Sequence, residues 1–231
     1  MNFLRKAKGY FSKGELVLLT SSVVLIITAF VVFDRENWLT LAASLIGAAS
    51  LIFCAKGHPA GQFLMIVFSI LYGIISYSFA YYGEMMTYLG MTAPMAVLSL
   101  VSWLRNPYSG ESREVKVNRI GKCELILMIL LTVIVTAAFY FILGAFGTAN
   151  LIPSTVSVTT SFAAAYLTFR RSPFYALLYA CNDAVLILLW VLAAMEDRAY
   201  ISVAVCFVMF LANDLYGFVS WRRMEKRQRA G

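Results

Sequence analysis

The side chains that could do chemistry in this chain are few, and two of them lie deep within long apolar runs. Asp183 and Asp214 are the only acidic residues so placed. An aspartate at the centre of a membrane-spanning helix costs roughly 2.5–3.5 kcal/mol on insertion scales, so such residues usually face a cavity or a polar partner. We therefore expect contact with a polar ligand, with a hydrogen bond between helices as the alternative.

Asp183 belongs to a stripe of polar and aromatic residues. Tyr179, Asp183, Leu186 and Trp190 have the i, i+4, i+7, i+11 spacing of one helix face, with Asn182 at its edge. This face is predicted to line a substrate-binding site. Tyr179 would stack on a ring there, and Asn182 or Asp183 would bond hydroxyl groups or a positively charged ring. Trp190, near the outer end of its helix, could gate the site.

Two other apolar runs supply further candidates. Asn213 and Tyr216 lie one helical turn apart and are predicted substrate contacts, while Gly217 beside them permits close approach of a neighbouring helix. An earlier run adds a stripe whose members could line the site or simply pack: Tyr72, Ser76 and Tyr77.

Other site chemistries find no support in the sequence. His58 is the only histidine and lies in a short loop, so no His-x-x-x-His metal motif exists. The four cysteines include no Cys-x-x-Cys pair, which argues against a zinc site or a disulfide framework. We expect no cofactor, no metal and no catalytic residue, and an intramembrane enzyme is the less favoured alternative.

The elements that must position these residues are membrane-spanning helices. The 231 residues are 61% hydrophobic and 13% charged, with a mean hydropathy of +0.78, whereas globular proteins carry about 25% charged residues. Large soluble domains are excluded, and nucleic-acid binding is not expected. A spanning helix needs about 20 apolar residues. Eight such runs predict an all-α polytopic fold, approximately at 16–33, 39–55, 63–82, 85–104, 123–147, 151–169, 174–194 and 200–221.

The basic residues orient these helices in the bilayer. With a cytoplasmic N-terminus, 17 of the 19 Lys and Arg residues lie on the inner side, and only Arg35 and Arg198 fall outside. This asymmetry follows the positive-inside rule and requires an even number of spans. We expect a bacterial inner-membrane protein with both termini in the cytoplasm and an uncleaved first span. The basic tail is interpreted as an orienting cluster, with anionic lipid contact as the alternative.

The chain also contains an internal duplication. Four spans separate equivalent points, so both halves face the same way, as in transporters whose substrate site lies between parallel repeats. The segment 105–122 is the predicted hinge between the halves. Three pairs of motifs recur: Glu-Leu-Val-Leu at 15–18 and Glu-Leu-Ile-Leu at 124–127, Lys-Gly-His-Pro at 56–59 and Arg-Arg-Ser-Pro at 170–173, and Ser-Trp-Leu-Arg at 102–105 and Ser-Trp-Arg-Arg at 220–223.

Three residues near or within the spans are given structural roles. Trp103 and Trp221 close equivalent spans and are followed by arginines, which is typical of anchors at the membrane interface. Pro94 stands within the fourth run and is predicted to kink it, either as a hinge or as a static bend.

Several of these residues resemble the signatures of a known family. Gly83-Glu84-Met85, Pro94-Met95 and the run 102–106 resemble the first-half signature of the PnuC family, and the run 211–221 resembles the second. PnuC proteins are bacterial nicotinamide riboside transporters, with relatives that take thiamine, riboflavin or deoxynucleosides. The resemblance covers about Leu39 to Met224.

The resemblance implies a core of three helices, a linker helix and three more, similar to SWEET sugar transporters. It implies facilitated uptake of a small vitamin or nucleoside by alternating access, capture by a cytoplasmic kinase and a possible homotrimer. A non-transporting receptor or regulatory subunit is the alternative. The implied parts are an N-terminal segment with an extra helix at 1–38, a first three-helix bundle at 39–105, a loop and linker helix at 106–150, a second bundle at 151–223 and a basic tail at 224–231.

The sequence departs from the family at predicted ligand-facing positions. Phe68 and Ala96 stand where relatives often carry Asn and Gln, and Tyr179 and Asp183 stand where relatives often carry Trp and Asn. The expected substrate is therefore nicotinamide riboside or a related vitamin or nucleoside.

Overall fold

The computed structural model describes residues 10–78, 82–108, 114–148 and 150–230. Within these ranges the regular elements are helices, apart from an isolated β-bridge between Pro107 and Val115. Residues 109–113 of the predicted hinge lie outside the described ranges, as do four of the basic residues counted above, namely Arg5, Lys6, Lys8 and Arg113.

The helices follow the predicted runs closely. Seven are continuous: α2 (Lys13–Phe33), α3 (Trp38–Ala55), α4 (Ala60–Ser78), α7 (Lys122–Ala145), α8 (Leu151–Phe169), α9 (Tyr175–Ala194) and α10 (Ile201–Ala230). The fourth predicted run consists of α5 (Tyr82–Thr87), the π-helix η1 (Tyr88–Thr92) and α6 (Ala93–Leu104), and a 3₁₀ turn, η2 (Arg198–Tyr200), precedes α10.

Among the described residues, seven helical segments are long and apolar enough to cross a membrane. The exception is α8, the sixth predicted span, a helix of 19 residues that contains seven Ser and Thr residues. Three of these hydroxyls bond side chains of the neighbouring helices α7 and α9. The polar residues of α8 are therefore accommodated by contacts with other helices. The prediction of an all-α membrane protein is confirmed, and seven of the eight predicted spans are candidate spans in the described residues. That α8 also crosses the membrane stays a prediction.

The fourth span deviates from a regular α-helix next to Pro94. Pro94 stands in the first turn of α6, where its missing N–H matters least. The five residues before α6 form the π-helix, and the Ala93 N–H bonds the Tyr88 carbonyl five residues back. A π-turn of this kind accommodates an irregularity without ending the helix. The role of Pro94 as a hinge stays a prediction.

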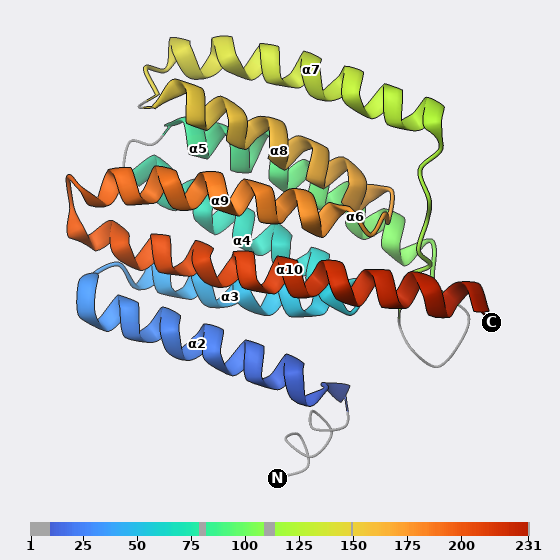
Figure 1. Ribbon diagram of the computed structural model, residues 1–231. Coiled ribbons are helices and arrows are strands. Elements are labelled where there is room, and N and C mark those ends of the chain that lie inside the picture. The colour runs from blue at the N-terminus through green and yellow to red at the C-terminus, as the bar shows by residue number, and fades with distance from the viewer. Residues whose placement is uncertain (1–9, 79–81, 109–113, 149, 231) are drawn as a thin grey trace.

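The helices pack as two groups of three, flanked by two more. We call α3, α4 and α6 the first group and α8, α9 and α10 the second group. The groups meet along a seam, where α10 packs on α3 and α6 packs on α8. Outside the groups, α2 lies against α3 and α10, and α7 lies against α8, so α2 and α7 form opposite edges of the bundle (Figure 1).

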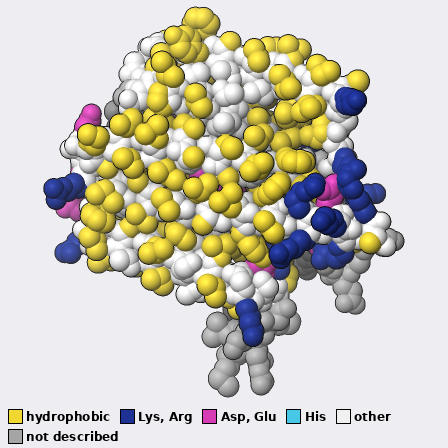
Figure 2. Space-filling view, viewed as in Figure 1, with side chains coloured by type: hydrophobic (Ala, Val, Ile, Leu, Met, Phe, Trp, Pro, Cys, Tyr) yellow, Lys and Arg dark blue, Asp and Glu magenta, His cyan; other side chains and the backbone are white. Residues whose placement is uncertain are grey.

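The surface has the character of a membrane protein. Hydrophobic side chains cover the middle of the face shown in Figure 2, and Lys and Arg side chains gather where α10 ends. We call this the basic end. Many large apolar residues are exposed, as is Tyr77, whose side chain is 63% exposed. The expectation that Tyr77 could line an inner stripe is therefore wrong.

Candidate functional site

Two tryptophans close the seam at the basic end. The ring centroids of Trp103 and Trp221 are 5.3 Å apart, and both side chains are fully buried. Trp103 Nε1 donates to the Thr168 carbonyl at 2.9 Å, and Trp221 Nε1 donates to the Cys54 carbonyl at 2.8 Å. The interpretation of these residues as membrane-interface anchors is wrong, because their rings face each other and their N–H groups bond backbone across the seam.

The serines beside these tryptophans make a matching pair of contacts. Ser102 Oγ donates to the Phe169 carbonyl at 2.8 Å, and Ser220 Oγ donates to the Ala55 carbonyl at 2.7 Å. Each of α6 and α10 is therefore fixed to the first helix of the other group by one indole and one hydroxyl bond. The repeated Ser-Trp dipeptide supplies both.

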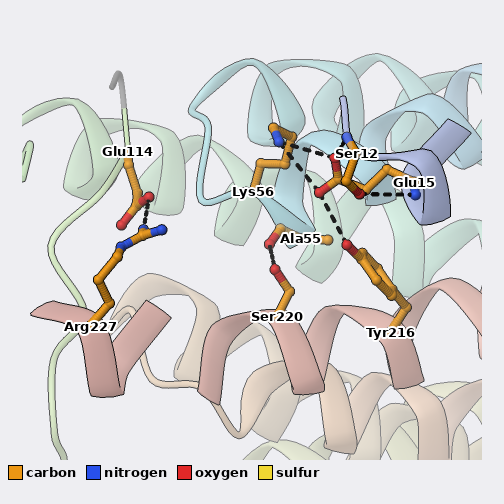
Figure 3. A network of polar contacts seen from close by, with 8 residues as sticks. All are labelled: Ser12, Glu15, Ala55, Lys56, Glu114, Tyr216, Ser220 and Arg227. Carbon is orange, nitrogen blue, oxygen red and sulfur yellow. Dashed lines mark hydrogen bonds and ion pairs between the residues drawn. The ribbon is translucent and has the colours of Figure 1, made fainter. Parts of the chain in front are cut away.

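The two flanking helices also carry corresponding ion pairs. Lys56 Nζ lies 3.1 Å from Glu15 Oε2, and the Tyr216 hydroxyl donates to Glu15 Oε1 at 3.1 Å (Figure 3). Glu15 stands in the first turn of α2, and Lys56 directly follows α3. An ion pair of the same kind joins Glu124, at the start of α7, to Arg170, which follows α8.

Asp183 and Asp214 meet inside the bundle. Each residue is only 4% exposed, and their side chains lie close enough to interact with each other. Asp183 Oδ2 is buried without a hydrogen-bond partner. Among the ion pairs of the described residues, none involves either aspartate. Tyr179 lies close enough to interact with both carboxyl groups, so this aspartate pair and Tyr179 form one cluster.

Aromatic rings fill the seam between the aspartate pair and the far end of the bundle. The Tyr72 ring centroid lies 4.5 Å from that of Tyr88, 6.2 Å from that of Trp190 and 5.9 Å from that of Phe207. All four residues are buried. The structure thus brings together Tyr72 and Trp190, which lie on different predicted stripes.

A cavity of about 180 Å³ opens beside Trp190, at the end opposite the basic end. Glu84 and Glu196 contribute carboxylates to its lining, and Thr148 contributes a hydroxyl. Trp190 lines both this cavity and the aromatic cluster. The cavity therefore forms a partly polar entrance to the seam at that end.

Asn182 is directed towards α8. Its Oδ1 accepts hydrogen bonds from Ser157 Oγ at 3.0 Å and from Thr160 Oγ1 at 2.9 Å. Asn182 of α9 thus bonds α8, which belongs to the same group. It is next to Asp183 in the sequence, but these side-chain bonds go to α8.

Two other predicted substrate contacts face α2. Asn213 Nδ2 donates to Ser22 Oγ at 3.0 Å, and Tyr216 bonds Glu15. Asn213 and Tyr216 thus make side-chain bonds to α2, and their role as substrate contacts stays a prediction. Gly217 lies where α10 approaches α3 and α9, in agreement with the expected close packing.

Comparison with known proteins identifies the family. Residues 37–223 match the family described as nicotinamide mononucleotide transporter. The chain belongs to this family. It is 26% identical over 200 residues to the nicotinamide riboside transporter PnuC of Neisseria mucosa, covering 85% of this chain and 76% of that protein. It is 23% identical to the nicotinamide riboside transporter PnuC of Haemophilus influenzae, covering 98% and 99% of the two chains.

The fold is also similar to that of a solved PnuC. The crystal structure of the vitamin B3 transporter PnuC superposes with a TM-score of 0.84 at 25% identity, covering 98% of this chain and 97% of that chain. The resemblance to PnuC proteins is thus confirmed. As a PnuC relative, the chain is a multi-pass membrane transporter and not an enzyme.

Sequence reasoning missed some of the residues that build this PnuC-type seam. Tyr88 was not a candidate, although its ring packs on Tyr72. Glu84 entered only through its family signature, although it lines the cavity beside Trp190. The available signal was an acidic residue at the start of an apolar run, which is typical of a helix N-terminus as well.

Proposed function

We propose that this protein mediates facilitated uptake of nicotinamide riboside, or of a related vitamin or nucleoside, across a bacterial inner membrane. Its relatives are nicotinamide riboside and vitamin B3 transporters, which supports this substrate class. The substrate would bind between the two helix groups, and access would alternate as one group rocks against the other.

The observation that carries the proposal is the buried aspartate pair beside Tyr179. Two carboxyl groups without a basic partner favour a ligand that brings its own positive charge or hydroxyl donors. The pyridinium ring of nicotinamide riboside is cationic, and an aromatic face beside a carboxylate stabilises such a ring. We propose Tyr179 and Asp183 as direct contacts, with Tyr72 and Trp190 closing the path from the opposite end.

The alternating motion is proposed from the matched contacts across the seam. The Ser-Trp bonds of α6 and α10 and the ion pairs of α2 and α7 are corresponding interactions made by the two halves of the chain. They support a parallel repeat in which α2 and α7 occupy equivalent positions. Two similar halves on either side of one seam could separate at either end of the bundle, which is what alternating access requires.

The orientation is proposed from charge. The basic end carries the C-terminal Arg and Lys residues (Figure 2), and the positive-inside rule places such an end in the cytoplasm. The cavity beside Trp190 would then open to the outside. A membrane-impermeant label on a C-terminal cysteine should react only after the membrane is permeabilised.

The direct test is uptake into liposomes that contain the purified protein. Radiolabelled nicotinamide riboside, thiamine, riboflavin and deoxynucleosides should be offered one at a time. We expect saturable uptake of at least one of them that stops at equal concentrations inside and outside. Loading the liposomes with a matching kinase and ATP should raise the total accumulated. Absence of saturable uptake for the whole panel, with folded protein, would refute the proposal.

A further inference from the structure

A second cavity lies at the basic end, between α7 and the second group. Its volume is about 390 Å³. Leu125 and Met128 of α7 form one wall, and Leu167 of α8 and Phe174 form the other. Because Leu125 stands in the first turn of a candidate span, the cavity lies where the apolar part of the bundle begins. We call it the α7 crevice.

Arginines surround a single carboxylate at the rim of the α7 crevice. Arg119 Nε lies 2.9 Å from Glu225 Oε1, Arg222 Nη1 lies 2.7 Å from Glu225 Oε2, and Arg229 pairs with the same carboxylate. Three positive charges against one negative charge leave a local excess of two. A guanidinium has five N–H donors, and the Arg119 and Arg222 side chains remain 68% and 41% exposed.

The outer part of the α7 crevice is open and its inner part is buried. Leu125 and Phe174 are exposed at its mouth, whereas Met128 and Leu167 are buried behind them. Among the described helices, α7 packs mainly on α8 and makes no contact with α10. A basic rim above an apolar slot between spanning helices matches the two parts of an anionic phospholipid.

We propose that the α7 crevice binds an anionic phospholipid, with its phosphate on Arg119 and Arg222 and an acyl chain between α7 and the second group. The lipid would connect α7 to α10 across a gap that protein side chains leave open. This site is separate from the seam, so the proposal does not depend on the substrate.

The same end of the bundle contains a natural control. A cavity of about 500 Å³ beside α6 is lined by apolar residues such as Phe63, Leu100 and Leu104. The described residues that line it include Glu114 but no Lys or Arg. Both cavities offer apolar slots, but Glu114 at the control cavity pairs with one arginine, Arg227, whereas three arginines pair with Glu225 at the α7 crevice. Only the α7 crevice therefore has an excess of positive charge among the ion pairs of the described residues, and charge should decide where the anionic lipid binds.

Lipid binding can be measured by native mass spectrometry and by thermal unfolding of the full-length protein in detergent. Phosphatidylglycerol should remain bound and raise the unfolding temperature more than phosphatidylcholine does. The double variant Arg119→Gln/Arg222→Gln should bind phosphatidylglycerol roughly thirtyfold more weakly. The matched control Arg35→Gln/Arg198→Gln, which removes two charges at the opposite end, should bind as the wild type does.

A second variant keeps the charges and fills the slot. Met128→Trp should reduce binding of phosphatidylglycerol while inorganic phosphate remains without effect on either protein. Equal stabilisation by both lipids, or unchanged phosphatidylglycerol binding in the folded double variant, would overturn the proposal. Stabilisation by inorganic phosphate alone would also overturn it, because it would indicate a free-anion site.

Discussion

The rings of Trp103 and Trp221 lie against each other with centroids 5.3 Å apart, at the point where α6 and α10 approach each other. Each indole N–H crosses the seam to a backbone carbonyl near the end of the first helix of the other group. Two residues that are 118 positions apart in the sequence thus perform the same task. This correspondence is what the predicted duplication would produce.

The corresponding bonds predict corresponding losses. Trp103→Phe and Trp221→Phe each remove one indole N–H donor, while the Thr168 and Cys54 carbonyls each keep a backbone donor. The loss of one such hydrogen bond costs about 0.5–1.5 kcal/mol. We expect the two variants to lower the free energy of unfolding by similar amounts in a detergent unfolding assay. Trp38→Phe is the control, because Trp38 is 68% exposed. A neutral effect at either buried position would contradict the assigned contact.

The aspartate pair predicts a charge-dependent loss of transport. Asp183→Asn keeps the side-chain shape and removes the negative charge, so uptake of the nicotinamide riboside cation at low concentration should fall roughly 10- to 100-fold. Uptake of its reduced, uncharged form should fall much less. Glu36→Gln, an exposed acid at the opposite end, should transport normally. Equal losses for both forms would show that Asp183 does not sense ligand charge.

The position of Asn213 predicts a different outcome from that of Asp183. Asn213→Ala removes the bond to Ser22 and should lower stability by about 1 kcal/mol. Because Asn213 faces α2, the KM for uptake should remain that of the wild type. A large rise in KM with unchanged stability would instead place Asn213 in the substrate path.

Two glycines predict opposite responses to a methyl group. A Cβ at Gly217 would lie 3.6 Å from the Ala176 Cβ, an ordinary contact, so Gly217→Ala should fold normally. A Cβ at Gly61 would lie 2.6 Å from the backbone nitrogen of Cys54, which cannot move aside. We expect Gly61→Ala to lower the unfolding temperature strongly. Size-exclusion profiles and thermal unfolding of both variants provide the comparison.

The sequence predicted the helices well because long apolar runs in lipid have few alternatives. The importance of Asp183 and Asp214 could also be predicted, since an acid deep in a span needs a polar surrounding, but their contact with each other was not predicted. Each stripe was placed on a helix face from spacing alone, and that spacing does not say which neighbour the face meets. α10 touches α2, α3 and α9, so Asn213 could have faced any of them.

Other features depend on contacts that no local pattern encodes. Trp103 stands near a helix end and close before an arginine, which is typical of an interface anchor, but contacts with Thr168 of α8 and Trp221 of α10 hold it in the interior. The π-helix before Pro94 arises because α5 and α6 must continue one span around a missing N–H. Both outcomes are decided by packing between distant segments.

The four Trp and Ser bonds across the seam make the two ends of the bundle mechanically unequal. At the basic end, separation requires directional hydrogen bonds on both sides of the Trp pair to break together. At the other end, ring contacts dominate, and such contacts weaken gradually as surfaces slide. We therefore expect the two groups to separate first at the end opposite the basic end, so that a solute arriving from that side would meet the weaker contacts.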